Sequence, residues 1–317
     1  MISRRQFHRV SLAAAAAAAV PDASRAQSPP ASGAPAAMAQ RPEFRGTLKP
    51  ELHGTHGMVA AGRQFTVEAG IRLLKAGGNA FDAGAAAVFA AAASEISHFG
   101  LGGEAPVALF EARSGKVSIV CGQGTAPKAA TPALFRPLGV IPGNGPNGGT
   151  VPAVVDAMAR LLQQFGTKSL AEVLAPAIEL ADGFPVYDML RSSLVFNREP
   201  TQIWQWARRT YYPQGRIPEV GEMFRQPNLA ATLRALAAAE QSALKNGSDR
   251  AAAIEAGRDV FYKGDIARRI AAAVKADGGL LSYEDLATYK GRIEPAITTR
   301  FQGYDIHKAG FWSQGPA

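Results

Sequence analysis

Residues 54–131 constrain the fold more than any other stretch of this chain of 317 residues. The stretch reads as a helix, a glycine break, a second helix, a glycine loop and two strands joined by a turn. It ends at residues 122–127, which read Gly-Gln-Gly-Thr-Ala-Pro. Helices followed by a hairpin are typical of a layered α/β protein. The sequence therefore predicts an α/β body with a site where the second strand ends.

The first helix is predicted over residues 64–75. Val67, Ile71 and Leu74 lie at spacings of i, i+4 and i+7, so we expect them to form its buried face. Gly77 follows and should end the helix, because glycine readily adopts the left-handed conformation that many helix C-termini need.

A second helix is predicted to begin at Asn79, which can cap it together with Asp82 three residues later. Alanines at 85–87 and 90–93 make one side of this helix small and apolar. Small side chains allow close approach, so we expect this helix to be buried against a sheet.

The glycine loop at residues 100–105 formally matches a dinucleotide-binding pattern. That motif needs a strand before it and a helix after it, so that the helix N-terminus meets the pyrophosphate. Here a helix precedes the loop and a strand follows it. The sequence therefore favours a tight connection between helix and strand, not a nucleotide site.

Several short motifs lie along the chain from residue 57 onward. The following segments resemble, in order along the chain, those of the γ-glutamyltransferase (γ-glutamyltranspeptidase) family: residues 57–60 (GMVA), 69–83 (ending in LKAGGNAFDA), 100–103 (GLGG), 125–127 (TAP), 149–152 (GTVP), 174–186, 224–233, 261–264 (FYKG) and 278–286. Each match alone is weak, but their number and order are specific.

The resemblance implies an N-terminal nucleophile hydrolase with an αββα sandwich. In that family the precursor cleaves itself before a threonine, which becomes the N-terminus of a small subunit and attacks the γ-glutamyl carbonyl with its own α-amine as base. The threonine follows a proline-rich stretch, and this chain ends inside the corresponding segment, residues 311–317. We therefore expect an incomplete large-subunit region without a catalytic residue of its own, since Thr131, Thr298 and Thr299 are not placed to serve.

Two residues are candidates for binding the substrate. By resemblance, an arginine near the Thr-Ala-Pro segment binds the α-carboxylate of a γ-glutamyl group, and Gln123 stands at that position here. Arginine gives a charge-assisted pair of about 1.5–3 kcal/mol, and a neutral amide bond gives roughly 0.5–1.5 kcal/mol. Lys128 could replace the missing charge only if its side chain turns back toward the pocket. The glycines that flank Gln123 favour close approach of a ligand.

The N-terminal segment predicts export. Residues 1–26 combine Arg4 and Arg5, a short alanine-rich apolar core and small residues for cleavage, which is typical of a twin-arginine signal peptide and a periplasmic or secreted protein. Residues 27–45 are rich in Pro, Ala, Ser and Gly and are expected to form a disordered linker. Residues 46–317 would then form the folded region.

The remaining composition excludes several classes of function. The formal net charge is +8, but no basic run is interleaved with aromatics, so we expect no nucleic-acid partner. The apolar core of the signal is too short to span a bilayer, and no membrane partner is expected. The single Cys121 excludes an internal disulfide, and His53 and His56 lack further ligands nearby, so neither a metal nor a cofactor is expected.

Further elements are predicted beyond residue 131. We expect helices at 153–165, 170–182, 229–244, 266–276 and 282–289, and strands at 293–300 and 304–307. Residues 191–218 are interpreted as a peripheral helical excursion packed by its aromatics, with a binding surface as the alternative. Residues 237–256 are interpreted as an alanine-rich insertion.

Three functions remain open on the sequence alone. The first is hydrolysis or transfer of small γ-glutamyl compounds such as glutathione, together with the protein's own small subunit. The second is hydrolysis of a different small amide by a member of the same family. The third is a periplasmic protein that binds a small ligand without catalysis, or an inactive remnant.

Overall fold

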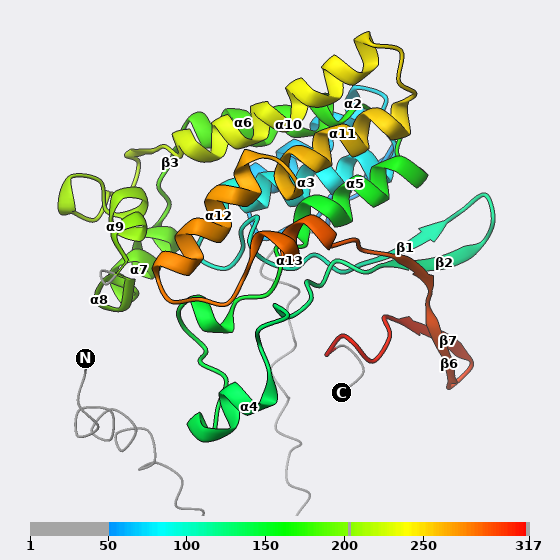
Figure 1. Cartoon of the computed structure of the whole chain (residues 1–317). Coiled ribbons are helices and arrows are strands. Elements are labelled where there is room, and N and C mark those ends of the chain that lie inside the picture. Colours follow the sequence, from blue (N-terminus) through cyan, green and yellow to red (C-terminus); the bar gives the residue numbers. More distant parts are fainter. Residues whose placement is uncertain (1–50, 202–203, 315–317) are drawn as a thin grey trace, which may run out of the picture. The chain divides into compact units, whose positions relative to one another are not determined.

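The computed structural model describes residues 51–201 and 204–314 (Figure 1). The predicted signal peptide (1–26) and linker (27–45) lie outside the described residues. Residues 53–317 group into one unit by their contacts, and the fold below is that of this unit.

Helices make up most of this unit. They are α2 (Gln64–Lys75), α3 (Ala80–Ser94), α4 (Pro132–Phe135), α5 (Val154–Phe165), α6 (Leu170–Asp182), α7 (Asp188–Phe196), α8 (Arg198–Thr201), α9 (Gln205–Tyr211), α10 (Pro227–Lys245), α11 (Arg250–Tyr262), α12 (Asp265–Ala276) and α13 (Tyr283–Thr288). The strands are β1 (Val107–Glu111), β2 (Lys116–Val120), β3 (Phe184–Pro185), β4 (Met223–Phe224), β5 (Ile293–Pro295), β6 (Ile297–Phe301) and β7 (Tyr304–Lys308). Short 3-10 turns lie at Arg136–Leu138, Pro146–Gly148 and Pro213–Gly215.

Helix α2 has the predicted bounds but not the predicted buried face. Val67, Ile71 and Leu74 are only half-buried. The reason is the contact with α3: a Cβ on Gly70 would lie 3.2 Å from the backbone oxygen of Ala83, so the two helices approach closely through small residues. The fully buried face consists of Thr66, Ala69, Gly70 and Leu73.

The start of α3 confirms the predicted capping box. The side chain of Asn79 accepts hydrogen bonds from the backbone N–H groups of Phe81 and Asp82, and Asp82 accepts from the N–H of Asn79 at 2.8 Å. Asp82 also accepts from Thr167 and Lys168 at the start of the loop before α6. Burial alone would raise the pKa of Asp82, but these hydrogen bonds outweigh it and hold the pKa below its ordinary value.

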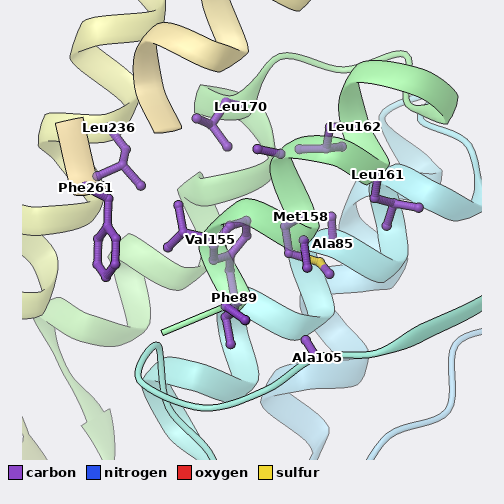
Figure 2. Packing of buried hydrophobic residues seen from close by; sticks show 14 of the residues in the cluster. Ala85, Phe89, Ala105, Val155, Met158, Leu161, Leu162, Leu170, Leu236 and Phe261 are labelled. Atoms are coloured by element: carbon purple, nitrogen blue, oxygen red, sulfur yellow. The ribbon is translucent and has the colours of Figure 1, made fainter. Parts of the chain in front are cut away.

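The prediction that this second helix packs against a sheet is wrong. Helix α3 lies among α2, α5 and α6, and Figure 2 shows Ala85 and Phe89 beside Val155 and Met158 of α5. The physical reason is that α3 is apolar around its whole circumference, so it needs neighbours on several sides. A three-stranded sheet can cover only one of them.

The sheet joins two distant parts of the chain in the order β1-β2-β5. β1 and β2 form the predicted hairpin, with Val107 opposite Val120. β5 pairs antiparallel with β2, so that Ile293 lies opposite Val120. The predicted strand 293–300 is divided after Pro295, because β6 leaves this sheet and pairs with β7 in a separate exposed hairpin. The pairing with β5 fixes the end of β2, where the candidate site begins.

Residues 237–256, interpreted as an insertion, form the C-terminal part of α10 and the first half of α11. Helix α10 contacts α6 and α11, and Leu236 is fully buried. Glu240 is also fully buried, and its carboxylate accepts from the backbone N–H groups of Leu170 and Ala171 at the start of α6. An acidic group at a helix N-terminus satisfies donors that have no partner inside the helix.

The excursion after α6 is helical, as predicted. Helices α7 and α9 contribute to a second small core, whose buried residues are Phe184, Val186, Leu190, Leu194, Tyr212 and Phe224. The Tyr212 hydroxyl donates to the backbone oxygen of Leu194 at 2.9 Å. Trp206 lies instead at the surface, with about half of its area exposed. Across the described ranges, no helix is both long and apolar enough to cross a membrane.

Candidate active-site loop

The candidate site is the loop of residues 122–128, which follows β2. A Cβ on Gly122 would lie 1.9 Å from the backbone oxygen of Ala105, and one on Gly124 would lie 1.7 Å from that of Val151. Only glycine fits at either position, because the loop runs between two other backbone segments. The glycines therefore serve packing against the protein's own backbone, and the close approach of a ligand to Gln123 stays a prediction.

Hydrogen bonds hold the first half of the loop in this channel. The backbone N–H of Ala105 donates to the oxygen of Gly122 at 2.8 Å, and that of Val151 donates to the oxygen of Thr125 at 3.0 Å. The N–H of Cys121, just before the loop, donates to the oxygen of the residue before β5 at 2.8 Å. The loop thus has a fixed course from its first residue.

Helix α13 and the residue after it hold both ends of the loop. The Tyr289 hydroxyl donates to the backbone oxygen of Gln123 at 3.0 Å, and the backbone N–H of Lys128 donates to Asp285 at 3.0 Å. Asp285 also forms the predicted capping box with Ser282. Burial alone would raise the pKa of Asp285, but the hydrogen bonds from Ser282 and Lys128 hold it below its ordinary value.

A buried ion pair anchors Tyr289 in turn. Arg258 and Asp156 are almost fully buried and hydrogen-bonded to each other. Arg258 also donates to the backbone oxygen of Tyr289, and Asp156 accepts from the N–H of Gly291 at 2.8 Å. The guanidinium carbon lies 4.3 Å from the centre of the Tyr262 ring. Burial raises the pKa of the Tyr289 hydroxyl, so this group stays protonated and donates to the loop across the neutral pH range.

The two predicted binding residues differ in their surroundings. The Gln123 side chain is half-buried and makes no hydrogen bond to another residue within 51–201 and 204–314. The Lys128 side chain is 70% exposed, and its ammonium lies 3.9 Å from a carboxylate oxygen of Glu284. The structure therefore places the two residues at opposite ends of one loop and directs the Lys128 charge toward α13. Gln123 retains a free amide.

Sequence reasoning missed the residues that hold the loop. Asp285 is recognisable from the sequence only as a helix cap, and Tyr289 carries no local signal, because its partner Gln123 lies 166 residues away. Arg258 lies just after the segment interpreted as an insertion. The one usable signal was its position four residues before Tyr262, which places both on one helical face.

The other candidates have local roles in the structure. Thr131 is the residue before α4, and the Thr298 hydroxyl lies 2.8 Å from His307 across the β6–β7 hairpin. Thr299 is exposed on the same hairpin. Among the residues that the structure describes, no three His, Cys, Asp or Glu side chains gather as a metal site.

Curated proteins with similar sequences indicate the family of this chain. The glutathione hydrolase-like YwrD proenzyme of Bacillus subtilis (strain 168) is 32% identical over 265 residues, which are 83% of this chain and 47% of that protein. The acylase ACY 1 proenzyme of Pseudomonas sp. (strain SE83) is 30% identical over 287 residues, 86% of this chain and 48% of that protein. The chain thus spans about half the length of these curated relatives.

A solved structure shows which fold this chain has. The crystal structure of Helicobacter pylori γ-glutamyltranspeptidase matches with a TM-score of 0.74 and 27% identity, over 84% of this chain and 73% of that one. The fold is therefore the α/β fold of the N-terminal nucleophile hydrolases. The γ-glutamyltranspeptidase family model matches residues 66–317. This chain belongs to the γ-glutamyltranspeptidase family and covers its large-subunit region.

Proposed function

We propose that the protein containing this chain hydrolyses a small amide or transfers its acyl group, acting on γ-glutamyl compounds or close analogues. Family membership supports the reaction class. The observation that carries the proposal is the 122–128 loop. Backbone contacts fix it on both sides, while the Gln123 amide has no hydrogen-bond partner among the described residues. A rigid loop with one free polar side chain can position a substrate at low entropic cost.

The reaction also needs a nucleophile, which we assign to an N-terminal threonine of a small subunit outside this chain. Its hydroxyl oxygen would form a bond to the amide carbon, and its own α-amine would take the hydroxyl proton. The carbon–nitrogen bond of the substrate amide then breaks, and the amine of the substrate leaves with the proton that the α-amine took up. Water or a second amine would release the acyl group from the threonine. The residues of this chain would bind and orient the acyl group during both steps.

The surroundings of Gln123 favour substrates without an α-carboxylate. A buried carboxylate without a countercharge is costly, and a neutral amide compensates it less than arginine does. Lys128 is engaged on the side of Glu284. A relative named as an acylase is consistent with this second candidate, the hydrolysis of a different small amide.

We also propose that the protein is exported. The support is the sequence of residues 1–26 alone, in which Arg4 and Arg5 precede a short apolar core. A fusion of these residues to a reporter should reach the periplasm, and replacing both arginines with lysine should stop it. Unchanged delivery of that variant would contradict the twin-arginine route.

The test of the reaction uses the complete reading frame. Mass spectrometry of the purified protein should find two chains, the second beginning with threonine. The protein should release p-nitroaniline from γ-glutamyl p-nitroanilide or from 4-aminobutyryl p-nitroanilide, which lacks only the α-carboxylate. A protein that stays uncleaved and turns over neither compound would be a binding protein or a remnant, and the proposal would be wrong.

A further inference from the structure

A hollow of about 480 Å³ lies between α9 and α12, which Figure 1 places next to each other. Three separate parts of the chain line it: Gly145 and Pro146, the two tryptophans at 204 and 206, and the C-terminal half of α12 with Asp277. None of its lining residues belongs to the 122–128 loop. Its volume falls within the range of about 300–1,000 Å³ that is typical of small-molecule sites.

The walls of this hollow are apolar and in part aromatic. Trp204 and Trp206 are stacked, with ring centroids 6.2 Å apart and an angle of 27° between their planes. Ile270 and Val274, one turn apart on α12, form an aliphatic wall. The Trp206 indole is held in place because its Nε1–H donates to Asp277 at 3.1 Å. The hollow therefore offers flat apolar surfaces to an aromatic ring or to an aliphatic chain about as wide as a ring.

The hollow contains one charged group, the carboxylate of Asp277. Of the eight described residues that line the hollow, only Asp277 carries a charge. Asp277 makes no ion pair with any residue in the described ranges. Arg208 and Arg209 of α9 line a second hollow beside Tyr212. Asp277 is exposed, and its side chain accepts the hydrogen bond from Trp206.

We propose that this hollow binds a small organic cation with a flat apolar body, such as a benzylammonium compound. The ring of the ligand would lie against the indoles and the aliphatic wall, where burial of apolar area stabilises it. Its ammonium would lie near Asp277 and over an indole face, and tryptophan is the strongest of the aromatic side chains in attracting a cation. This site is additional to the amide site proposed above and does not depend on it.

The test is titration calorimetry on the complete protein with benzyltrimethylammonium as the probe and benzyl alcohol as its neutral counterpart. We expect saturable binding of the cation and at least about tenfold weaker binding of the alcohol. Asp277→Asn should weaken cation binding by about tenfold, since it removes the charge but keeps an oxygen that can accept from Trp206. Asp265→Asn is the matched control, because Asp265 lies on the same helix but is paired with Arg269 at 2.9 Å. It should bind like the wild type.

A second measurement locates the ligand. In protein labelled with 5-fluorotryptophan, Trp204→Phe and Trp206→Phe identify the fluorine resonances of the hollow, and the cation should shift those two and not that of Trp312. The same resonances show whether the wall remains intact in Asp277→Asn. Absence of saturable binding, equal affinity for the alcohol, or equal affinity of Asp277→Asn and the wild type would overturn the proposal.

Discussion

Replacing Arg258 with methionine should destabilise the protein strongly. The change removes the guanidinium that donates to Asp156, to Asp259 and to the backbone oxygen of Tyr289. Breaking a buried ion pair costs roughly 3–5 kcal/mol, because one charge stays buried without its partner. Arg160 still donates to Asp156 at 3.2 Å, so we expect the lower end, about 3 kcal/mol. Methionine keeps the apolar volume and does not itself open a large cavity.

The assay is unfolding of the complete protein in urea. With a slope of roughly 3 kcal/mol/M, a loss of about 3 kcal/mol lowers the midpoint by about 1 M. Arg269→Met is the control, since it breaks the ion pair with Asp265 on the surface, where 69% and 78% of the two side chains are exposed. A pair of this kind contributes about 0–1 kcal/mol. If both variants lost the same small amount, the buried pair would not anchor the segment that carries Tyr289.

Three more changes test the loop and the cap. Tyr289→Phe removes the hydroxyl that donates to Gln123, a bond that contributes roughly 0.5–1.5 kcal/mol, and should lower kcat/KM for the amide probes by up to about tenfold. Unchanged kinetics would show that this bond does not position the loop. Gly124→Ala would place a Cβ 1.7 Å from a backbone oxygen and should abolish activity or folding. Gly84→Ala on α3 meets no atom within 4 Å and should stabilise the protein by about 0.5–1 kcal/mol. Equal effects of the two changes would contradict the close approach of the backbone segments at Gly124. Burial alone would raise the pKa of Asp82, but the hydrogen bonds to its carboxylate hold this pKa below the ordinary value. The carboxylate should therefore stabilise the fold above about pH 4, and this contribution should be lost as the pH falls through the lower pKa of the folded state. Asp82→Asn should therefore flatten the acid side of the curve of unfolding free energy against pH, and an unchanged curve would show that Asp82 does not contribute.

Local signals in the sequence predicted local structure well. The capping boxes at Asn79 and Ser282 were predictable because each involves residues three apart, and the bounds of α2 and α6 followed from glycines and caps next to them. The buried face of α2 was not predictable, because it depends on Ala83 of the neighbouring helix and not on the size of its own side chains.

The candidate site was predictable only in part. The segment that contains Gln123 was recognisable from family resemblance, and the pattern of helices and strands before it predicted its place at a strand end. Its supports were not, because Tyr289 and Asp285 contact it across 166 and 157 residues of sequence, and Arg258 acts on it only through Tyr289. The close packing of the glycines around Gln123 was not predictable for a similar reason: the atoms that require them belong to Ala105 and Val151.

The most direct test of the proposed role of Gln123 compares two substrates in the complete enzyme. The ratio of kcat/KM for γ-glutamyl p-nitroanilide to that for 4-aminobutyryl p-nitroanilide reports on the α-carboxylate alone. We predict that the wild type favours the 4-aminobutyryl compound and that Gln123→Arg shifts the ratio toward γ-glutamyl by about tenfold, equivalent to about 1.4 kcal/mol. Lys128→Ala should leave the ratio unchanged, since this side chain faces Glu284. A wild type that strongly prefers the γ-glutamyl compound, with a ratio that Gln123→Arg does not move, would contradict the assignment of the substrate site to this loop.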